Sequence, residues 1–280
     1  MISMQVHNLN LFLSKHQASM ADCFDHALAV LRDSWNTKWC GLPQVLHACI
    51  EFLDFQESEL TLEVRQLLSA SQEVAEMLES MCQNGSAYSE PRYHNRLHTA
   101  DVMVAMALQI SIEAKLLNAR APEWFAAGLL TAVAHDFGHP GRVNVQPSEI
   151  EKKSFSAVLP IMVKHGVKSK WLSNVQYAVE RSDFALVAEN HQRVQDLPFQ
   201  WNQDWLAVLL NEADILGSSI SAYGESLGQA LSEEWRLIDF PAAETVATPT
   251  GRSVFLKSLS FSSNAASELK VQEKISAQIT

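Results

Sequence analysis

The sequence predicts an all-α protein. Apolar residues recur at intervals of three and four along most of the chain, which is the period of an amphipathic helix. The strict alternation of apolar and polar residues that is typical of half-buried strands is nearly absent. The chain has 280 residues, of which 47% are hydrophobic, so it can bury a substantial core. The helical period is clearest in residues 21–35, 42–55, 62–81, 121–137 and 204–220.

Three regions follow one another within what we expect to be a single domain over residues 1–280. Residues 1–90 are predicted to form a helical subregion, and they end in a loop rich in Gly, Ser and Pro. Residues 91–261 carry the polar motifs described below. Within this region, residues 240–252 are predicted to form a second long loop. Residues 262–280 are expected to be a polar tail that frays.

The charge of the chain limits the partners that we expect. The formal net charge is -11 at pH 7, and such a surface repels an extended nucleic acid. A small anionic substrate is compatible with this charge if a local cation, such as a metal ion, reverses the field. No stretch approaches the roughly 20 apolar residues that cross a bilayer, so we expect no membrane partner.

Cysteine usage indicates a reducing compartment. The sequence contains no Cys-x-x-Cys pair, and its N-terminus does not combine a basic leader with an apolar run of signal-peptide length. We therefore expect a cytoplasmic protein. The four cysteines are Cys23, Cys40, Cys49 and Cys82.

The stretch "YHNRLHTADV", residues 93–102, is predicted to open a helix with polar side chains on one stripe. His94, His98 and Asp101 are spaced by four and three residues, so they share one face while Met103 points elsewhere. Imidazoles are only moderate helix formers and poor core fillers. This stripe therefore indicates a functional use of the three side chains.

Two further stretches carry polar residues into apolar surroundings. In "LLTAVAHDFGHPG", residues 129–141, His135 and Asp136 follow an apolar run, and the Gly and Pro residues beyond them end the helix. In "LLNEADILG", Asp214 again lies among apolar residues. An unpartnered buried carboxylate is strongly disfavoured, and a metal ion is a suitable partner for it.

Together these stretches supply two histidines and two carboxylates from three predicted helices. These are hard-to-borderline ligands, which are suited to Zn, Mn, Fe or Mg and are unlike the soft ligands of a thiolate site. A lone His-x-x-x-His pair is more often structural, and a lone helical Asp is normally a cap or an ion-pair partner. The conjunction favours a metal site, because five of the ten histidines fall in three short motifs. Those histidines are His94, His98, His135, His139 and His191.

A resemblance to a known family joins these motifs. "YHNRLHTADV" followed by "HDFGHPGRVN" resembles the paired signature of the class I cyclic-nucleotide phosphodiesterases, a branch of the HD-domain metal phosphohydrolases. "ENHQ", residues 189–192, is similar to that family's Glu-Asn-His-His element, and Asp214 lies at the place of its last metal-binding aspartate. The resemblance implies an all-α, compact, multi-helix HD/phosphodiesterase-type domain with a dinuclear metal site.

The resemblance also implies a role for each matching position. The tighter ion, usually zinc, would be held by His98, His135, Asp136 and Asp214. Asp136 would also bridge to a second ion, usually magnesium or manganese. The other implied positions are His94 as the general acid, His139 and Glu189 organising water around the ions, Asn144 and Asn190 supporting the site by hydrogen bonds, and Tyr93 lining the pocket near the phosphate.

The chemistry of phosphodiester cleavage explains why such a site combines metal ligands with a general acid. The reaction needs an activated water, neutralisation of charge on the phosphoryl oxygens and a proton for the leaving alkoxide. His94 lies one helical turn before His98, so its imidazole projects beside the ions without having to bind them. An unperturbed histidine pKa of about 6.5 suits proton donation near neutral pH. Asp101 is expected to orient one of the two imidazoles.

Three features depart from the family pattern. An additional helical stretch at about 147–180 separates the His-Asp motif from the Glu-Asn-His element. Gly217 and Ser218 stand where the family has Asn and Pro. The base-binding glutamine and the Phe three residues later correspond to Arg252 and Phe255. If Arg252 reaches the base, its donors fit the O6 and N7 acceptors of guanine and favour cyclic GMP; otherwise it lies on an exposed loop.

We therefore expect metal-dependent hydrolysis of a 3',5'-cyclic nucleotide, cAMP or cGMP, to the 5'-monophosphate, with a homodimer as a possible assembly. One alternative is an HD phosphohydrolase that acts on a nucleoside monophosphate or a cyclic dinucleotide. Another is a catalytically silent HD domain that serves as a nucleotide sensor. His94 beside a complete ligand set speaks against the silent domain, because a sensor needs no acid for a leaving group.

Overall fold

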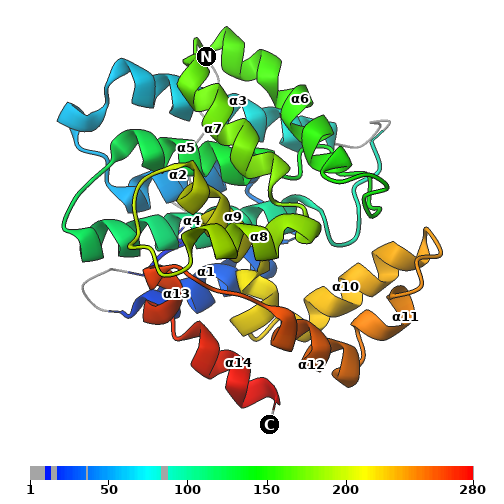
Figure 1. Ribbon diagram of the computed structural model, residues 1–280. Helices are drawn as coiled ribbons and strands as arrows, with labels where there is room; N and C mark the ends of the chain where they lie inside the picture. Colours follow the sequence, from blue (N-terminus) through cyan, green and yellow to red (C-terminus); the bar gives the residue numbers. More distant parts are fainter. Residues whose placement is uncertain (1–9, 14–17, 36, 83–87, 280) are drawn as a thin grey trace.

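The molecule is all-helical in the part that the structure describes (Figure 1). This computed structural model describes residues 10–13, 18–35, 37–82 and 88–279, and within these ranges the chain forms helices and loops but no strand. The predicted fold class is confirmed. The loop predicted at the end of the N-terminal subregion lies partly outside the described residues.

The helices fall into two groups along the chain, with one long connection before α4 and another before α6. The first group is α1 (Met20–Ser34), α2 (Leu42–Leu53), the short 3-10 helix η1 (Glu57–Glu59), α3 (Leu62–Met81), α4 (Arg96–Leu117) and α5 (Pro122–Ala134). The second group is α6 (Glu149–Lys164), α7 (Ser169–Glu180), α8 (Phe184–Val194), α9 (Gln203–Ile220), α10 (Gly224–Arg236), α11 (Ala243–Val246), α12 (Pro249–Ser258), α13 (Asn264–Glu268) and α14 (Val271–Ile279). None of these described helices combines the length and hydrophobicity that crossing a bilayer requires.

Helix α4 is the central element of the core. It packs against α1, α2, α5, α9 and α13. Apolar side chains on all of its faces are buried, among them Val102, Met103 and Met106, as is typical of a helix enclosed by others. Its first turn is fixed by Asn95, whose side chain accepts a hydrogen bond from the backbone N–H of His98 at 3.1 Å. This cap holds the turn that carries His98 in place.

Two further buried helices bring polar residues towards that turn. Nearly the whole of α5 is buried and apolar, and it ends at Ala134, so His135 and Asp136 follow at the inner end of the helix. Gly138 then turns the chain with a φ of 68°, in the left-handed region that glycine favours. Helix α9 packs against both α4 and α5 and carries Asp214 in its C-terminal half.

The additional stretch between the His-Asp motif and the Glu-Asn-His element forms α6 and α7. Helix α6 packs against α3 and α7, and α7 packs against α5 and α9. Trp171 of α7 is buried, and its indole N–H donates to Glu63 of α3 at 2.8 Å. The extra helices are therefore integrated into the core.

Two segments that the sequence predicted to be irregular are helical. Residues 240–252 contain α11 and the start of α12, which begins with a Thr248 side-chain cap on the Gly251 N–H at 3.0 Å. The predicted polar tail forms α13 and α14 and buries Leu269, Val271 and Ile275. The predictions of a loop and of a frayed tail failed because polar residues separate the few apolar positions in both segments. Their helices are stabilised by packing against the rest of the protein, which the sequence pattern does not show.

Two buried carboxylates anchor the beginning of α13. Glu113 of α4 accepts hydrogen bonds from the backbone N–H of Ala265 at 2.8 Å and from the Asn264 amide at 3.0 Å. Glu212 of α9 accepts from the backbone N–H groups of Ser262 at 2.6 Å and Ser263 at 3.0 Å. Burial raises the pKa of Glu212 from 4.5 to about 7 despite these donors. The C-terminal segment is thus tied to the two central helices.

The Glu212→Gln variant should change how stability depends on pH. The folded pKa of Glu212 lies above its unfolded value, so the folded state binds more protons between pH 4.5 and about 7. Wild-type stability from this group is therefore greatest below pH 4.5 and is lost as pH rises through 7. Relative to wild type, Glu212→Gln should gain about 2 to 4 kcal/mol between pH 5 and pH 8.

Urea unfolding of the chelator-treated proteins at both pH values measures this difference. Glu268→Gln, at an exposed position of α13, is the matched control and should show no such gain. A Glu212→Gln variant that follows the wild-type pH dependence would contradict a raised pKa for this buried carboxyl.

Candidate metal centre and active site

Four side chains from three parts of the core converge on one point. His98 Nε2 lies 2.9 Å from Asp214 Oδ1 and 3.5 Å from Asp136 Oδ2. His135 Nε2 lies 3.2 Å from Asp136 Oδ2 and 3.8 Å from Asp214 Oδ1. Zinc bonds of about 2.1 Å in tetrahedral geometry separate the ligand atoms by about 3.4 Å, and the four distances bracket this value. The structure therefore brings together the four residues that the sequence singled out as ligands.

The Nε2 atoms of His98 and His135 are placed to bind a metal ion and not to form hydrogen bonds with the nearby carboxylates. Both Nε2 atoms are buried, and neither makes a hydrogen bond of acceptable geometry although carboxylate oxygens lie close by. His135 Nδ1 lies 2.8 Å from the carbonyl oxygen of Ala132. A proton on Nδ1 satisfies that contact and leaves the Nε2 lone pair pointing into the cluster. The donor set of two imidazoles and two carboxylates can hold a borderline or hard divalent ion.

The charges of the cluster also favour binding of a cation. Burial alone would raise the pKa of Asp136, but His135, His139 and His98 hold it well below its usual range. Burial opposes the charged form of His98, yet Tyr93, Asp136 and Asp214 raise the His98 pKa well above its usual value. Asp136 thus keeps its negative charge, and positive charge is favoured on the His98 imidazole. A metal ion supplies this charge without a proton.

A second histidine cluster lies beside the first. His94 Nδ1 lies 2.5 Å from Glu234 Oε1, and the Glu234 side chain is only 1% exposed. The other carboxylate oxygen of Glu234 accepts the backbone N–H groups of Tyr93 at 2.7 Å and His94 at 3.1 Å. The rings of His94 and His139 stack with their centroids 3.8 Å apart. His94 is therefore held on three sides, and its Nε2 is the nitrogen left for chemistry.

Glu234 is a residue of the site that sequence reasoning missed. It lies on α10 in the stretch "SEEWRL", where Glu is ordinary on an amphipathic helix and no spacing links it to the His motifs. Burial would raise the pKa of Glu234, but the adjacent His94 lowers it. The carboxylate is therefore ionised at neutral pH and can hold His94 by a charge-assisted hydrogen bond.

His139 is neutral in this arrangement. Its pKa is lowered to about 3, first by burial and then by repulsion from His94. The backbone N–H of Gly141 donates to His139 Nδ1 at 3.1 Å, so the ring proton lies on Nε2. His139 therefore provides one fixed N–H donor beside His94.

Tyr93 closes one side of the cluster. Its ring centroid lies 4.8 Å from that of His98, and its hydroxyl lies 3.0 Å from Ser218 Oγ. Gly217, which precedes this serine, lies against Asp101, because an added Cβ would come within 3.6 Å of Asp101 Oδ2. The two positions that depart from the family pattern therefore line the surroundings of Tyr93 and Asp101.

The expectation that Asp101 orients a site histidine is corrected by its actual partner. Arg32 of α1 binds both carboxylate oxygens of Asp101, at 2.7 and 2.5 Å. Arg32 also lies over the ring of Tyr223, 4.4 Å from its centroid. The stripe seen in the sequence is real, but its third member ties α4 to α1. The sequence gives no sign of a partner 69 residues away.

The Glu-Asn-His element also has partners that its motif did not predict. Glu189 is 46% exposed and forms ion pairs with Arg181 at 2.9 Å and Arg193 at 2.6 Å. In the described part of the chain, Glu189 is not among the carboxylates grouped with the site histidines. Asn190 is buried and donates to the Arg181 carbonyl at 2.8 Å and to Asn211 Oδ1 at 2.6 Å. Glu189 therefore links α8 to the end of α7, and Asn190 also reaches α9, which differs from their predicted roles near the ions.

Asn144 has a defined place in the loop after His139. Its amide donates to both carboxylate oxygens of Glu151, at 3.0 and 2.9 Å, and its oxygen accepts the backbone N–H of Ile150 at 2.8 Å. The hydrogen bonds of Asn144 therefore connect the motif loop to the first turn of α6.

The predicted base contacts lie on α12. Arg252 donates to the carbonyl oxygen of Ser218 at 3.1 Å and also binds Gln278 Oε1 of α14. Phe255 is partly buried and packs against the core. The position is helical and half-buried, which corrects the alternative of an exposed loop. The Arg252 guanidinium is engaged by the C-terminal end of α9 and by α14.

Comparisons with known proteins agree with this geometry. Residues 93–156 match the family described as 3'5'-cyclic nucleotide phosphodiesterase. The fold is similar to LmjPDEB1 solved in complex with IBMX, with 13% identity, a TM-score of 0.68, and coverage of 95% of this chain and 93% of that one. It is also similar to the phosphodiesterase domain of the RhoPDE fusion protein from the choanoflagellate Salpingoeca rosetta, with 13% identity, a TM-score of 0.59, and coverage of 99% and 94%. No curated protein sequence matches the chain.

The family match covers a short part of the chain, whereas the similarity of fold covers nearly all of it. The matched residues contain Tyr93, His94, His98, the His-Asp pair and His139, and the shared fold extends over nearly the whole chain. Residues 93–156 therefore carry the motif region of the 3'5'-cyclic nucleotide phosphodiesterase family, and nearly the whole chain has the fold of phosphodiesterase domains.

Proposed function

We propose that the chain is one catalytic domain that hydrolyses a 3',5'-cyclic nucleotide to the nucleoside 5'-monophosphate, using two divalent metal ions and His94 as the general acid. The observation that carries this proposal is the His94–Glu234 contact of 2.5 Å beside the convergence of His98, His135, Asp136 and Asp214. A histidine oriented in this way beside the proposed ligands can donate a proton to a leaving group.

The proposed ligand set is the one in the buried cluster: His98, His135, Asp136 and Asp214. Zinc suits these two imidazoles and two carboxylates, and magnesium or manganese would suit a second site held by Asp136 and otherwise by water. When bound, the ions activate a water and neutralise charge on the phosphoryl oxygens.

The protein's own residues perform the proton transfer. Glu234 holds His94 through Nδ1, so the transferable proton is on Nε2. That proton goes to the O3' alkoxide as the bond between phosphorus and O3' breaks. His139 is neutral and stacked on His94, so it fixes the plane of the acid and offers an Nε2–H donor beside it. Tyr93 lies over His98 and would face the phosphate.

The two alternative functions make different use of this site. A silent nucleotide sensor has no need for a buried glutamate that orients an acid, so the His94–Glu234 contact favours an enzyme. A nucleoside monophosphatase or a cyclic-dinucleotide phosphodiesterase would use the same metal chemistry. Purified protein supplied with zinc and manganese should release 5'-monophosphate from cyclic AMP or cyclic GMP. Hydrolysis of only nucleoside monophosphates or cyclic dinucleotides would contradict the proposal.

Base preference depends on whether Arg252 is free to reach the nucleotide. Its guanidinium already donates to Ser218 and Gln278, and moving it towards a base would break these bonds. We therefore expect Arg252→Gln to leave the ratio of kcat/KM for cyclic GMP and cyclic AMP unchanged while lowering thermal stability. A substitution that removes a preference for cyclic GMP would instead assign Arg252 to the base, with Phe255 as its neighbouring clamp.

Location and assembly are further parts of the proposal. Free thiols at Cys40, Cys49 and Cys82 support a reducing, cytoplasmic compartment. A homodimer stays a prediction, which sedimentation of the purified chain would test.

A further inference from the structure

Ser218 brings a hydroxyl group to the edge of the proposed site. It lies on α9, four residues after Asp214, so the two side chains share one face of the helix. Ser218 is 8% exposed, and its Oγ lies 3.0 Å from the hydroxyl oxygen of Tyr93. Ser218 stands where the family pattern has Pro, and a Pro side chain offers no hydroxyl for such a contact.

Tyr93, the partner of this serine, is fixed at both of its ends. Its backbone N–H donates to Glu234 at 2.7 Å, and its hydroxyl meets Ser218. The centroid of its ring lies 4.8 Å from that of His94 and 4.8 Å from that of His98. The contact with Ser218 therefore fixes the outer end of a side chain that lies against both the proposed acid and a proposed ligand.

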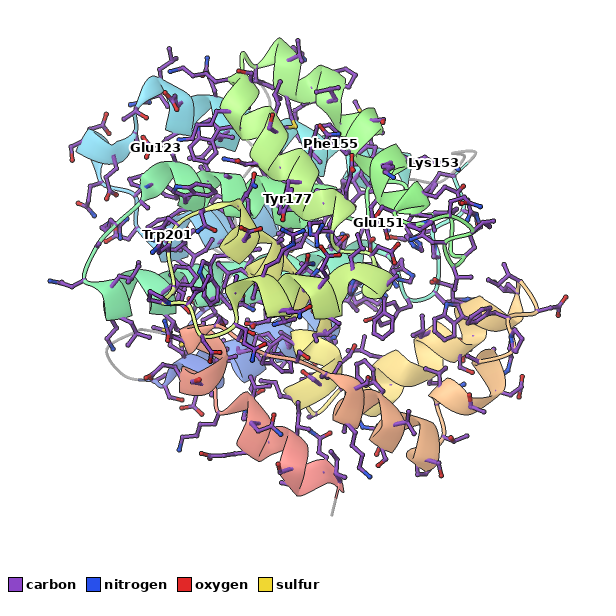
Figure 2. The ribbon with its side chains drawn as sticks, in the orientation of Figure 1. Glu123, Glu151, Lys153, Phe155, Tyr177 and Trp201 are labelled. Carbon is purple, nitrogen blue, oxygen red and sulfur yellow. The ribbon has the colours of Figure 1, made fainter. Side chains whose placement is uncertain are left out.

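The position of Ser218 is in turn set by three other helices. Its carbonyl oxygen accepts a hydrogen bond from Arg252 of α12 at 3.1 Å, and Arg252 also binds Gln278 of α14. At the start of α10, a Cβ added to Gly224 would come within 2.6 Å of the same carbonyl oxygen. In both figures α10, α12 and α14 lie together on the lower side, whereas α6 and α7, marked in Figure 2 by Glu151 and Tyr177, lie above them. Ser218 therefore belongs to a packed junction of C-terminal helices.

The pair of hydroxyl groups has one proton left to donate. Two hydroxyls share a single hydrogen bond, so one of their two protons is used and the other remains. Among the described residues, neither hydroxyl has another hydrogen-bond partner. Tyr93 is partly exposed whereas Ser218 is buried, so Tyr93 is the member of the pair that a ligand can approach. An anionic oxygen is the acceptor that gains most from such a donor.

We propose that Ser218 is a positioning residue that donates a hydrogen bond to the Tyr93 hydroxyl and thereby directs the Tyr93 O–H towards a phosphoryl oxygen of the substrate. This inference rests on the proposed phosphodiesterase function and adds a residue to its substrate contacts. Hydrogen bonds in a chain polarise one another, so the serine strengthens the donor that the phosphate meets. Ser218 acts on the phosphate through Tyr93 and does not touch it.

A double-mutant cycle with Tyr93→Phe tests this role. Ser218→Ala should raise KM for the cyclic nucleotide about 2- to 10-fold, the range for loss of one neutral hydrogen bond. The value of kcat should stay near that of wild type, because the phosphate contact is present both before and during the reaction. In the Tyr93→Phe background, Ser218→Ala should change KM little further, since the serine acts through the phenol hydroxyl.

Ser219→Ala is the matched control for this cycle. Ser219 is also buried on α9, but its hydroxyl donates to the carbonyl oxygen of Leu216 in the same helix at 3.1 Å. This variant should keep the wild-type KM in both backgrounds.

Nuclear magnetic resonance of the metal-free protein reads the contact without turnover. The chain has four tyrosines, so a carbon-13 label at the tyrosine Cζ gives few signals, and the one lost in Tyr93→Phe belongs to Tyr93. Ser218→Ala should shift that signal. Ser218→Thr, which keeps the hydroxyl, should leave it near the wild-type position, as should Ser219→Ala.

The two measurements separate this inference from the proposed function. An unmoved Tyr93 signal in Ser218→Ala, or an equal rise in KM with and without the Tyr93 hydroxyl, would overturn the inference while wild-type hydrolysis continues. A wild-type protein that hydrolyses no cyclic nucleotide, although its Tyr93 signal responds to Ser218→Ala, would overturn the proposed function and with it the phosphate contact.

Discussion

Asp136→Ala will abolish turnover of a cyclic nucleotide, with a loss beyond the roughly 10⁴-fold upper end that is typical of a missing general acid. The reason is that Asp136 is expected to face both ions, and its carboxylate lies within 3.5 Å of both His98 and His135. Removing it deletes a ligand and leaves two buried imidazoles without their anionic neighbour. Metal content by elemental analysis and kcat/KM by product release are the measurements.

A control variant distinguishes metal loss from a general effect on the fold. Asp33→Ala changes an exposed aspartate at the C-terminal end of α1 and should retain both metal and activity. Circular dichroism should show a folded Asp136→Ala protein. If that protein keeps its full metal content and its activity, the dinuclear assignment is wrong.

His94→Ala should lower the rate on a cyclic nucleotide by about 10² to 10⁴-fold, the range for a lost general acid. Zinc content should be unchanged, because His94 hydrogen-bonds Glu234 and stacks on His139 and is not one of the four proposed ligands. A phosphodiester with a nitrophenol leaving group needs little protonation, so its hydrolysis should be much less affected. Comparing the two substrates therefore isolates the proton from the rest of the chemistry.

His47→Ala, at an exposed position of α2, is the matched control and should behave as wild type on both substrates. Equal losses on the cyclic nucleotide and the nitrophenyl ester would reject His94 as the acid. Glu234→Gln provides an independent check, because it removes the charge that holds His94. Its effect should also be confined to the poor leaving group, and combining it with His94→Ala should add little, since the two residues act as one unit.

The sequence by itself determined the fold class and singled out the candidate ligand residues. The helical period along the chain follows from which residues must be buried, so it is present in the sequence before any contact forms. His98, His135, Asp136 and Asp214 could be found for a related reason. Each is a polar residue in an apolar segment, and burying such a residue requires a partner. The resemblance of "YHNRLHTADV" to the family signature, and not the spacing alone, gave His94 and His98 different expected roles.

Only the tertiary structure decided which partner each remaining polar residue has. Asp101 shares the stripe of His94 and His98, but Arg32 reaches it from another helix. Glu189 lies in a recognisable motif, yet its carboxylate forms ion pairs with Arg181 and Arg193. Glu234 has no motif at all and becomes part of the site because α10 packs against the loop before α4. Spacing along one helix fixes which side chains share a face, whereas contacts across helices depend on packing that involves residues far apart in the chain.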